Sequence, residues 1–178
     1  EAFAQEMNAQ YDPQISAVTS TAAALSGADV VITATNADQP VISTDLIEPG
    51  MHINAIGQYH PEKHEIEMET VEKSKYVPDL RERAFLDAGA FLQARETGLI
   101  SDDHIYAELG EIVSGVKPGR TSRDEITLFD SGGTAVETVA AAALVYRRAK
   151  EESRGIEIPF TSASETYEGK RSSTADEF

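Results

Sequence analysis

The sequence predicts an α/β fold in which helices alternate with the strands of a parallel sheet. A short apolar segment, residues 51–56, ends at Gly57 and is followed by polar residues, which is the pattern of a strand buried on both faces. A β-branched run at residues 30–33 has high strand propensity. The order strand, helix, strand, helix, strand over residues 15–56 requires a parallel sheet with right-handed crossovers.

Composition and charge narrow the class of protein. The 178 residues are enough for one domain or slightly more, with a buried core. The net charge of −16 comes from acidic residues scattered along the chain, which argues against a nucleic-acid partner because phosphate binding needs a basic face. Such a surface suggests the high-salt cytoplasm of a halophile. The chain contains no cysteine and no apolar run of membrane length, so we expect a cytoplasmic protein without a membrane partner.

The N-terminal third begins with three short elements. Residues 1–10 have the pattern of an amphipathic helix. Residues 15–18 are expected to form a short strand. Residues 20–25 are expected to form a short helix that Ser20 or Thr19 can cap.

The next segments lead to the most informative loop. Residues 28–35 are expected to form a second buried strand, and a brief helical turn at 44–47 precedes the strand at 51–56. Ligands of open α/β sheets bind outside the carboxyl ends of the strands. We therefore expect chemistry or cofactor contact in residues 57–65, although a plain strand-to-helix connection would have the same pattern.

The remaining elements complete the alternation. Helices are expected at residues 65–73, 79–88, 87–95 (with a possible break at Gly89) and 101–112, and strands at 75–78 and 125–129. Residues 134–152 form a long Ala-rich helix, which is apolar nearly all round and is therefore expected to be buried. Residues 161–178 lack periodicity and are expected to form a polar, disordered tail.

The turn DSGGT, residues 130–134, lies between a predicted strand and a predicted helix. Glycines allow close approach, and a helix N-terminus offers free N–H groups, so this arrangement can bind an anion. Ordinary capping by Ser131 or Thr134 explains the same residues. No GxGxxG fingerprint occurs in the chain.

The polar loop contains His60 and His64, four residues apart. A metal site would need both on one helix face, and the order HPEKH is not the HExxH of zinc enzymes. We therefore expect solvated loop histidines and no metal. Lys63 between them could meet a phosphate or a carboxylate as a point charge, or could simply be solvated.

Four stretches, in order, resemble the ornithine cyclodeaminase and mu-crystallin family, which includes archaeal alanine dehydrogenases. They are residues 28–35, 49–67, 108–120 and 126–146; the second and fourth are the specific ones. The resemblance implies a Rossmann-like domain that binds NAD or NADP, and a partner domain that binds a small amino or keto acid and forms a homodimer. The family's glycine fingerprint and its substrate-binding Lys and Arg residues would lie before Glu1.

The resemblance also assigns residues. The positions that look like dinucleotide contacts, or belong to the same turn, are Thr35, Gly57, Lys63, Ser131, Gly132 and Gly133. In several relatives an Asp acts in proton transfer at the position where this chain has Tyr59. A tyrosine hydroxyl is a weaker base than a carboxylate, so this departure counts against cyclodeamination. A reductase is less affected, because hydride chemistry belongs to the cofactor.

Taken together, the resemblance implies an α/β fold that is the C-terminal part of an NAD(P)-binding domain, followed by the Ala-rich helix. The expected domains are residues 1–131, the long helix and return segment at 132–160, and the tail at 161–178. The expected function is an NAD(P)-dependent oxidoreductase acting on a small amino or imino acid, with the 178-residue chain inactive by itself. The alternatives are ornithine cyclodeamination, or a non-catalytic protein that binds NADPH and a small ligand.

Overall fold

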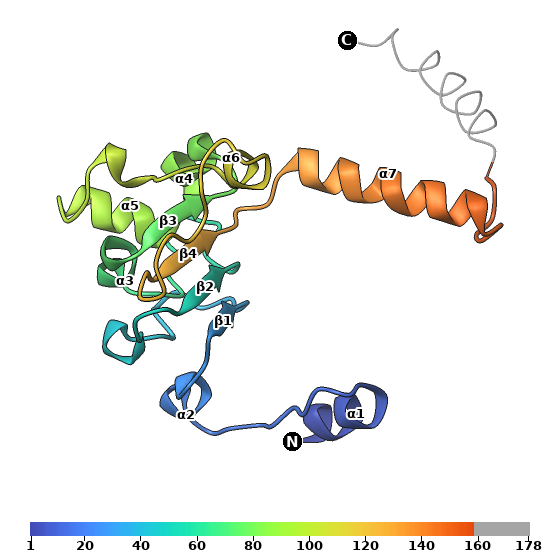
Figure 1. Ribbon diagram of the computed structural model, residues 1–178, viewed down its shortest axis with the longest axis horizontal. Coiled ribbons are helices and arrows are strands. Elements are labelled where there is room, and N and C mark those ends of the chain that lie inside the picture. The colour runs from blue at the N-terminus through green and yellow to red at the C-terminus, as the bar shows by residue number, and fades with distance from the viewer. Residues whose placement is uncertain (159–178) are drawn as a thin grey trace, which may run out of the picture. The chain divides into compact units, whose positions relative to one another are not determined.

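The protein contains a four-stranded parallel sheet, as the computed structural model of residues 1–158 shows (Figure 1). Its strands, in spatial order, are β1 (Val30–Thr33), β2 (His52–Ala55), β4 (Thr127–Asp130) and β3 (Lys75–Pro78). Val30 pairs with His52, and Thr127 pairs with both His52 and Lys75. The parallel α/β architecture predicted from the sequence is confirmed.

In residues 1–158, all helices but the last have nine residues or fewer, and the last has 17. They are α1 (Ala2–Gln10), α2 (Thr21–Leu25), α3 (Met68–Lys73), α4 (Arg81–Asp87), α5 (Gly89–Glu96), α6 (Leu109–Val113) and α7 (Ala135–Glu151), with 3-10 turns η1 (Thr44–Leu46) and η2 (Asp102–His104). Ser20 caps α2 as predicted, because its Oγ accepts a hydrogen bond from Ala23 N at 3.2 Å.

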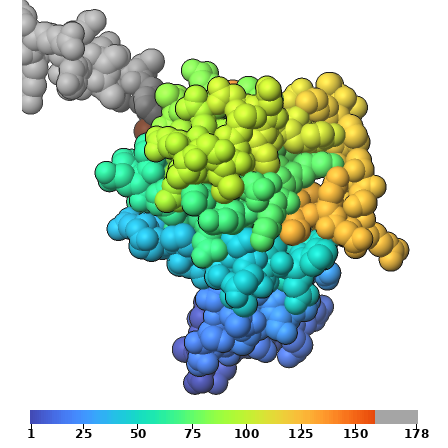
Figure 2. Space-filling model, turned by 90° about the vertical axis from the view of Figure 1, so that its left-hand side faces the viewer, coloured from blue at the N-terminus to red at the C-terminus, as the bar shows by residue number. Residues whose placement is uncertain are grey.

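The core lies on one face of the sheet, against α3, α4 and α5 (Figure 1). Phe91 of α5 stacks on Tyr76 of β3, with ring centroids 4.9 Å apart, and both side chains are fully buried. Inward-facing residues of the strands complete this core, including Ile53 and Leu128. Figure 2 views the molecule from the side on which the segment around α5 forms the central surface.

The opposite face of the sheet is only partly covered. Val30 and Ile32 of β1 are 56% and 63% exposed, and alternate residues of β2 are half-buried. Within the described structure, residues 51–56 are therefore not buried on both faces as predicted, and residues 28–35 are not the buried strand that was predicted. Helix α6 covers part of this face and leaves a groove of about 270 Å³ that is lined by Ile112.

Two further predictions about local structure are wrong. Residues 15–18 do not form a strand, because the Asn8 side chain binds both backbone groups of Ile15, at 2.6 and 2.8 Å. Residues 101–112 do not form one helix. Tyr106 N instead donates to the Tyr76 carbonyl at 3.0 Å, so this segment runs beside β3 and only its ends are helical.

The chain divides into two units, one ending at Thr134 and one starting at Ala135. The second begins with α7, in which no residue is buried. The expectation of a buried Ala-rich helix is not met in the described residues, because burial requires an apolar partner surface and residues 135–158 offer none. No helix in residues 1–158 is long and apolar enough to cross a membrane. The tail predicted at residues 161–178 lies outside the described residues.

Candidate functional site

The carboxyl ends of the strands lie in one row at one edge of the sheet. The register places Ala55 of β2 between Thr33 of β1 and Asp130 of β4, and Asp130 beside Pro78 of β3. Backbone hydrogen bonds continue this pairing beyond the strands: Ile56 N donates to the Thr33 carbonyl at 2.9 Å, and Ser131 N donates to the Ala55 carbonyl at 3.0 Å. The loops that carry the predicted site residues therefore leave the sheet side by side.

A buried carboxylate, Glu65, joins the ends of β1 and β2. Its Oε1 accepts a hydrogen bond from Thr35 N at 2.5 Å. Its Oε2 accepts one from the Thr33 hydroxyl at 2.7 Å and one from Gly57 N at 2.6 Å. The side chain is completely buried. The sequence prediction missed this role, because it placed Glu65 at the start of a helix that in fact begins at Met68.

The geometry explains why residue 57 is a glycine. A Cβ at Gly57 would lie 2.2 Å from the Thr35 carbonyl oxygen and 2.3 Å from Glu65 Oε1. Real Cβ atoms do not approach this closely, so a side chain here would displace the carboxylate or the backbone. Gly57 was predicted as a cofactor contact. The structure gives it a packing role as well, because its small size admits Glu65 between the two strand ends.

The hydrogen-bonded chain continues through Gln58 to the other two strands. Gln58 is fully buried. Its Oε1 accepts a hydrogen bond from Glu65 N at 3.2 Å, and its Nε2 donates to Asp130 Oδ2 at 2.8 Å. The Tyr76 hydroxyl of β3 donates to the same Asp130 oxygen at 2.8 Å. One buried polar chain therefore connects all four strands at their carboxyl ends.

Burial dominates the electrostatics of this chain. Desolvation raises the pKa of Asp130 to about 7, although the hydrogen bonds from Tyr76 and Gln58 oppose this rise. Asp79 and Asp87, which lie near it, raise it further. Burial and the Asp130 charge raise the pKa of Tyr76 well above 10, so Tyr76 acts as a hydrogen-bond donor here. With a pKa of about 7, Asp130 changes between its protonated and its ionised form near neutral pH.

The polar loop after β2 rests on the junction between α4 and α5. Gly89 N donates to the Gln58 carbonyl at 3.3 Å, and a Cβ on Gly89 would lie 2.0 Å from the Lys63 carbonyl oxygen. The break predicted at Gly89 is confirmed, because Ala88 is the extended residue that separates the two helices. The break lets the loop pack closely against the helix pair.

Lys63 and Tyr59 lie at the outer side of this edge. The Lys63 ammonium donates to the Asn36 carbonyl at 3.4 Å, and so bridges the loops that follow β1 and β2. It also lies 5.6 Å from the centre of the Tyr59 ring, within the range of a cation–π contact. Tyr59 is 49% exposed. These two side chains are accessible to a ligand, unlike Glu65 and Gln58.

The two glycines in the turn from β4 into α7 have different roles. Gly133 has a φ of +74°, which L side chains rarely adopt. A Cβ on Gly133 would meet nothing within 4 Å, whereas one on Gly132 would lie 3.4 Å from Asp87 Oδ1, an ordinary contact. Only Gly133 is therefore required by the backbone. The structure places Ser131 at the same edge as Thr35 and Gly57. Anion binding by this turn and ordinary capping of the helix both remain predictions.

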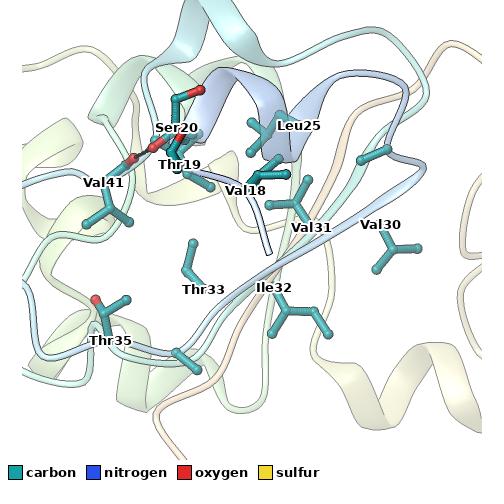
Figure 3. Close-up of a pocket in the computed structure, with 15 residues that line it drawn as sticks. Val18, Thr19, Ser20, Leu25, Val30, Val31, Ile32, Thr33, Thr35 and Val41 are labelled. Atoms are coloured by element: carbon teal, nitrogen blue, oxygen red, sulfur yellow. Dashed lines mark hydrogen bonds between the residues drawn. The ribbon is translucent and has the colours of Figure 1, made fainter. Parts of the chain in front are cut away.

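A large hollow lies along the free edge of β1 and reaches the row of strand ends (Figure 3). Its volume is about 590 Å³. Apolar side chains such as Val18, Leu25 and Val31 line it together with several Ser and Thr residues, and Thr33 and Thr35 lie toward the candidate site.

The histidines of the loop do not form a metal site in the structure. His60 is exposed and accepts a hydrogen bond at Nδ1 from Glu62 N at 3.3 Å. His64 is half-buried. Within residues 1–158, no three His, Asp or Glu side chains are grouped in a way that could hold a metal ion.

Comparisons with known proteins agree on one family. The model of the ornithine cyclodeaminase/mu-crystallin family matches residues 1–153. The alanine dehydrogenase of Archaeoglobus fulgidus is 40% identical over 149 residues, which are 84% of this chain and 46% of that protein. The chain spans about half the length of the curated relatives it matches.

Solved structures agree with this result. The Δ1-pyrroline-2-carboxylate reductase of Thermococcus litoralis, in complex with NADH and L-proline, superposes with a TM-score of 0.83 at 39% identity, over 88% of this chain and 49% of that one. An archaeal alanine dehydrogenase dimer with bound NAD superposes with a TM-score of 0.67 at 39% identity, over 74% and 41% of the two chains. The parallel sheet therefore corresponds to part of the fold of NAD-binding enzymes.

Proposed function

Because the chain belongs to the ornithine cyclodeaminase/mu-crystallin family, we propose that it is an NAD(P)-dependent oxidoreductase acting on a small amino or imino acid. The observation that carries the proposal is the carboxyl edge of the sheet. There Thr35, Gly57 and Ser131 lie on neighbouring strand ends, with Lys63 between two of the loops. Relatives named for alanine and for Δ1-pyrroline-2-carboxylate support this substrate class.

The residues at this edge fit a dinucleotide cofactor. A Cβ on Gly133 would meet nothing within 4 Å, so a ligand can approach the backbone of this turn, and the Lys63 ammonium suits a phosphate as a point charge. When bound, the nicotinamide donates or accepts the hydride. The residues of this chain that would hold it are Thr35, Gly57 and the turn Ser131-Gly132-Gly133.

Tyr59 favours the reductase over the cyclodeaminase. It is half-exposed, and Lys63 is next to its ring, so it can donate a hydrogen bond to a ligand but lacks the basicity of a carboxylate. A reductase needs no carboxylate base at this position if hydride transfer is the main step. The non-catalytic alternative, tight binding of NADPH and a small ligand, uses the same edge and differs only in turnover.

Further properties follow as parts of the same proposal. In this proposal residues 1–131 belong to the NAD(P)-binding domain, and residues 132–160, of which 159 and 160 lie outside the described residues, are the helix and return segment toward the substrate and dimerisation domain. An archaeal alanine dehydrogenase of this family is a dimer, which supports a homodimer. The net charge of −16 supports the high-salt cytoplasm of a halophile as the location.

The test is a turnover panel on the full-length protein. Reduced nicotinamide is followed by its absorbance, with pyruvate plus ammonia and with Δ1-pyrroline-2-carboxylate as substrates, and each of NADH and NADPH as the donor. We expect oxidation of one donor with at least one substrate. Release of ammonia from ornithine without net change in nicotinamide would favour the cyclodeaminase, and tight NADPH binding without any turnover would favour the binding protein.

A further inference from the structure

The completely buried carboxylate of Glu65 is unusual because no positive charge compensates for it. Burying a charge is costly unless hydrogen bonds or an opposite charge offset the lost hydration. Within residues 1–158, no Lys, Arg or His pairs with Glu65, and its partners are the Thr33 hydroxyl and the backbone N–H groups of Thr35 and Gly57. An apolar side chain would avoid the buried charge but leave these three donors without an acceptor, so the carboxylate is explained by what its partners do.

The partners of Glu65 suggest the explanation. Thr35 and Gly57 each lie two residues beyond the end of their strand, and the proposed function assigns both to the cofactor. The short bonds from their N–H groups, 2.5 and 2.6 Å, fix the two loops relative to each other. The glycine at position 57 admits the carboxylate, because any Cβ there would overlap it. The carboxylate and the loops thus fit together as one unit.

The unit extends to the third loop of the site. Gln58 accepts from Glu65 N and donates to Asp130, and Asp130 directly precedes Ser131. A shift of Glu65 would therefore move the end of β4 as well as those of β1 and β2. Every member of this chain, Thr33, Glu65, Gln58, Tyr76 and Asp130, is buried, so none of them can contact the cofactor as freely as Lys63 or Tyr59 can.

We propose that Glu65 is a positioning residue that sets cofactor affinity by holding the loops after β1, β2 and β4 in one arrangement. The inference rests on the proposed function, since it takes the cofactor to bind at these loops. A carboxylate suits this task because all three of its partners are donors. An amide at position 65 would point its own N–H₂ at one of them and lose that bond.

The test compares Glu65→Gln with Glu67→Gln in the full-length protein. Glu67 is the matched control, because its carboxylate binds Thr44, whose N–H donates to it at 2.7 Å, and makes no hydrogen bond to Thr33, Thr35 or Gly57 in the described structure. We expect the Kd for NADH to rise at least about tenfold in Glu65→Gln, the loss expected for a charge-assisted bond that positions a site. KM for NADH should rise while kcat changes little. Glu67→Gln should keep Kd within about twofold of the wild type.

A second readout keeps this proposal separate from the function itself. Amide hydrogen exchange at Thr35 and Gly57 should be faster in Glu65→Gln than in the wild type, and unchanged in Glu67→Gln. If the wild type binds no NADH, the proposed function fails, while this exchange result still decides whether Glu65 holds the loops. If Glu65→Gln does not fold, Glu65→Asp takes its place, because it keeps the charge on a shorter side chain and should weaken NADH binding in the same direction.

Two results would overturn the inference. One is an unchanged Kd for NADH in a folded Glu65→Gln protein whose wild type binds NADH. The other is a loss of affinity that is equal in Glu65→Gln and Glu67→Gln, because that would mean that any loss of stability weakens binding.

Discussion

Replacing Asp130 by Asn should make the protein more stable at alkaline pH. Asp130 is fully buried, and both of its donors, Gln58 Nε2 and the Tyr76 hydroxyl, point to the same oxygen, Oδ2. The oxygen of an Asn amide can accept both hydrogen bonds while its nitrogen takes the other position. The substitution therefore removes the buried charge and keeps the polar chain across the strand ends.

The magnitude follows from the pKa of Asp130, which rises from 3.8 to about 7 on folding. Because the folded-state pKa is the higher one, the native protein holds a proton that the unfolded chain has released between these pH values. Stability is therefore lost as pH rises from about 4 to 7. At about 1.4 kcal/mol per unit, the loss is at most about 4 kcal/mol above pH 7. Asn does not titrate, so the variant should not show this loss.

The assay is urea unfolding of the wild type and of Asp130→Asn at pH 5 and pH 8, with the free energy of unfolding extrapolated to water. Repulsion within the −16 chain acts on both proteins, so the difference between them isolates Asp130. We expect Asp130→Asn to gain stability relative to the wild type between pH 5 and pH 8. An equal difference at the two pH values would refute the reasoning that burial of this carboxylate costs stability.

Three other changes test separate parts of the structure. Gly57→Ala should lower the free energy of unfolding by at least about 2 kcal/mol in urea titrations, because its Cβ would overlap the Thr35 carbonyl; a stability equal to the wild type would contradict the close packing. Lys63→Ala should raise the Kd for NADH, measured by calorimetry, about fivefold. The control is Lys73→Ala, because Lys73 is exposed; equal affinities of the two variants would show that Lys63 does not bind the cofactor. The thermal midpoint should rise from 0.01 to 1 M KCl as the Debye length shrinks from about 30 to about 3 Å, and a flat or falling midpoint would argue against adaptation to high salt.

The strands could be predicted because each has a local signal. The β-branched run at residues 30–33 and the apolar segment ending at Gly57 identify β1 and β2, and their alternation with helices leads to the parallel sheet. The local signal fails where tertiary contacts decide the conformation. Ile15 has strand propensity, but the Asn8 side chain binds its backbone groups, and no periodicity in the sequence predicts such a contact.

The site could be predicted only in part, for the same reason. The carboxyl-end rule for parallel strands predicted a site in residues 57–65, and the resemblance to the family assigned Thr35, Gly57 and Ser131 to the cofactor. Glu65 and Gln58 were missed, because the pairing of Glu65 with Thr35 joins residues 30 positions apart. The one available signal was Gly57: a glycine after a strand can mean that a neighbouring group leaves no room for a side chain, but the sequence does not identify that neighbour.

Hydrogen exchange of the full-length protein with and without NADH tests the central claim most directly, because it asks whether the carboxyl edge of the sheet binds the dinucleotide. The account predicts slower exchange on NADH addition in the segments that contain residues 35–37, 57–63 and 131–134, with no change in the loop at residues 48–51 at the opposite edge. Binding of NADH, measured by calorimetry on the same sample, without protection of those three segments would contradict the assignment of the cofactor to this edge.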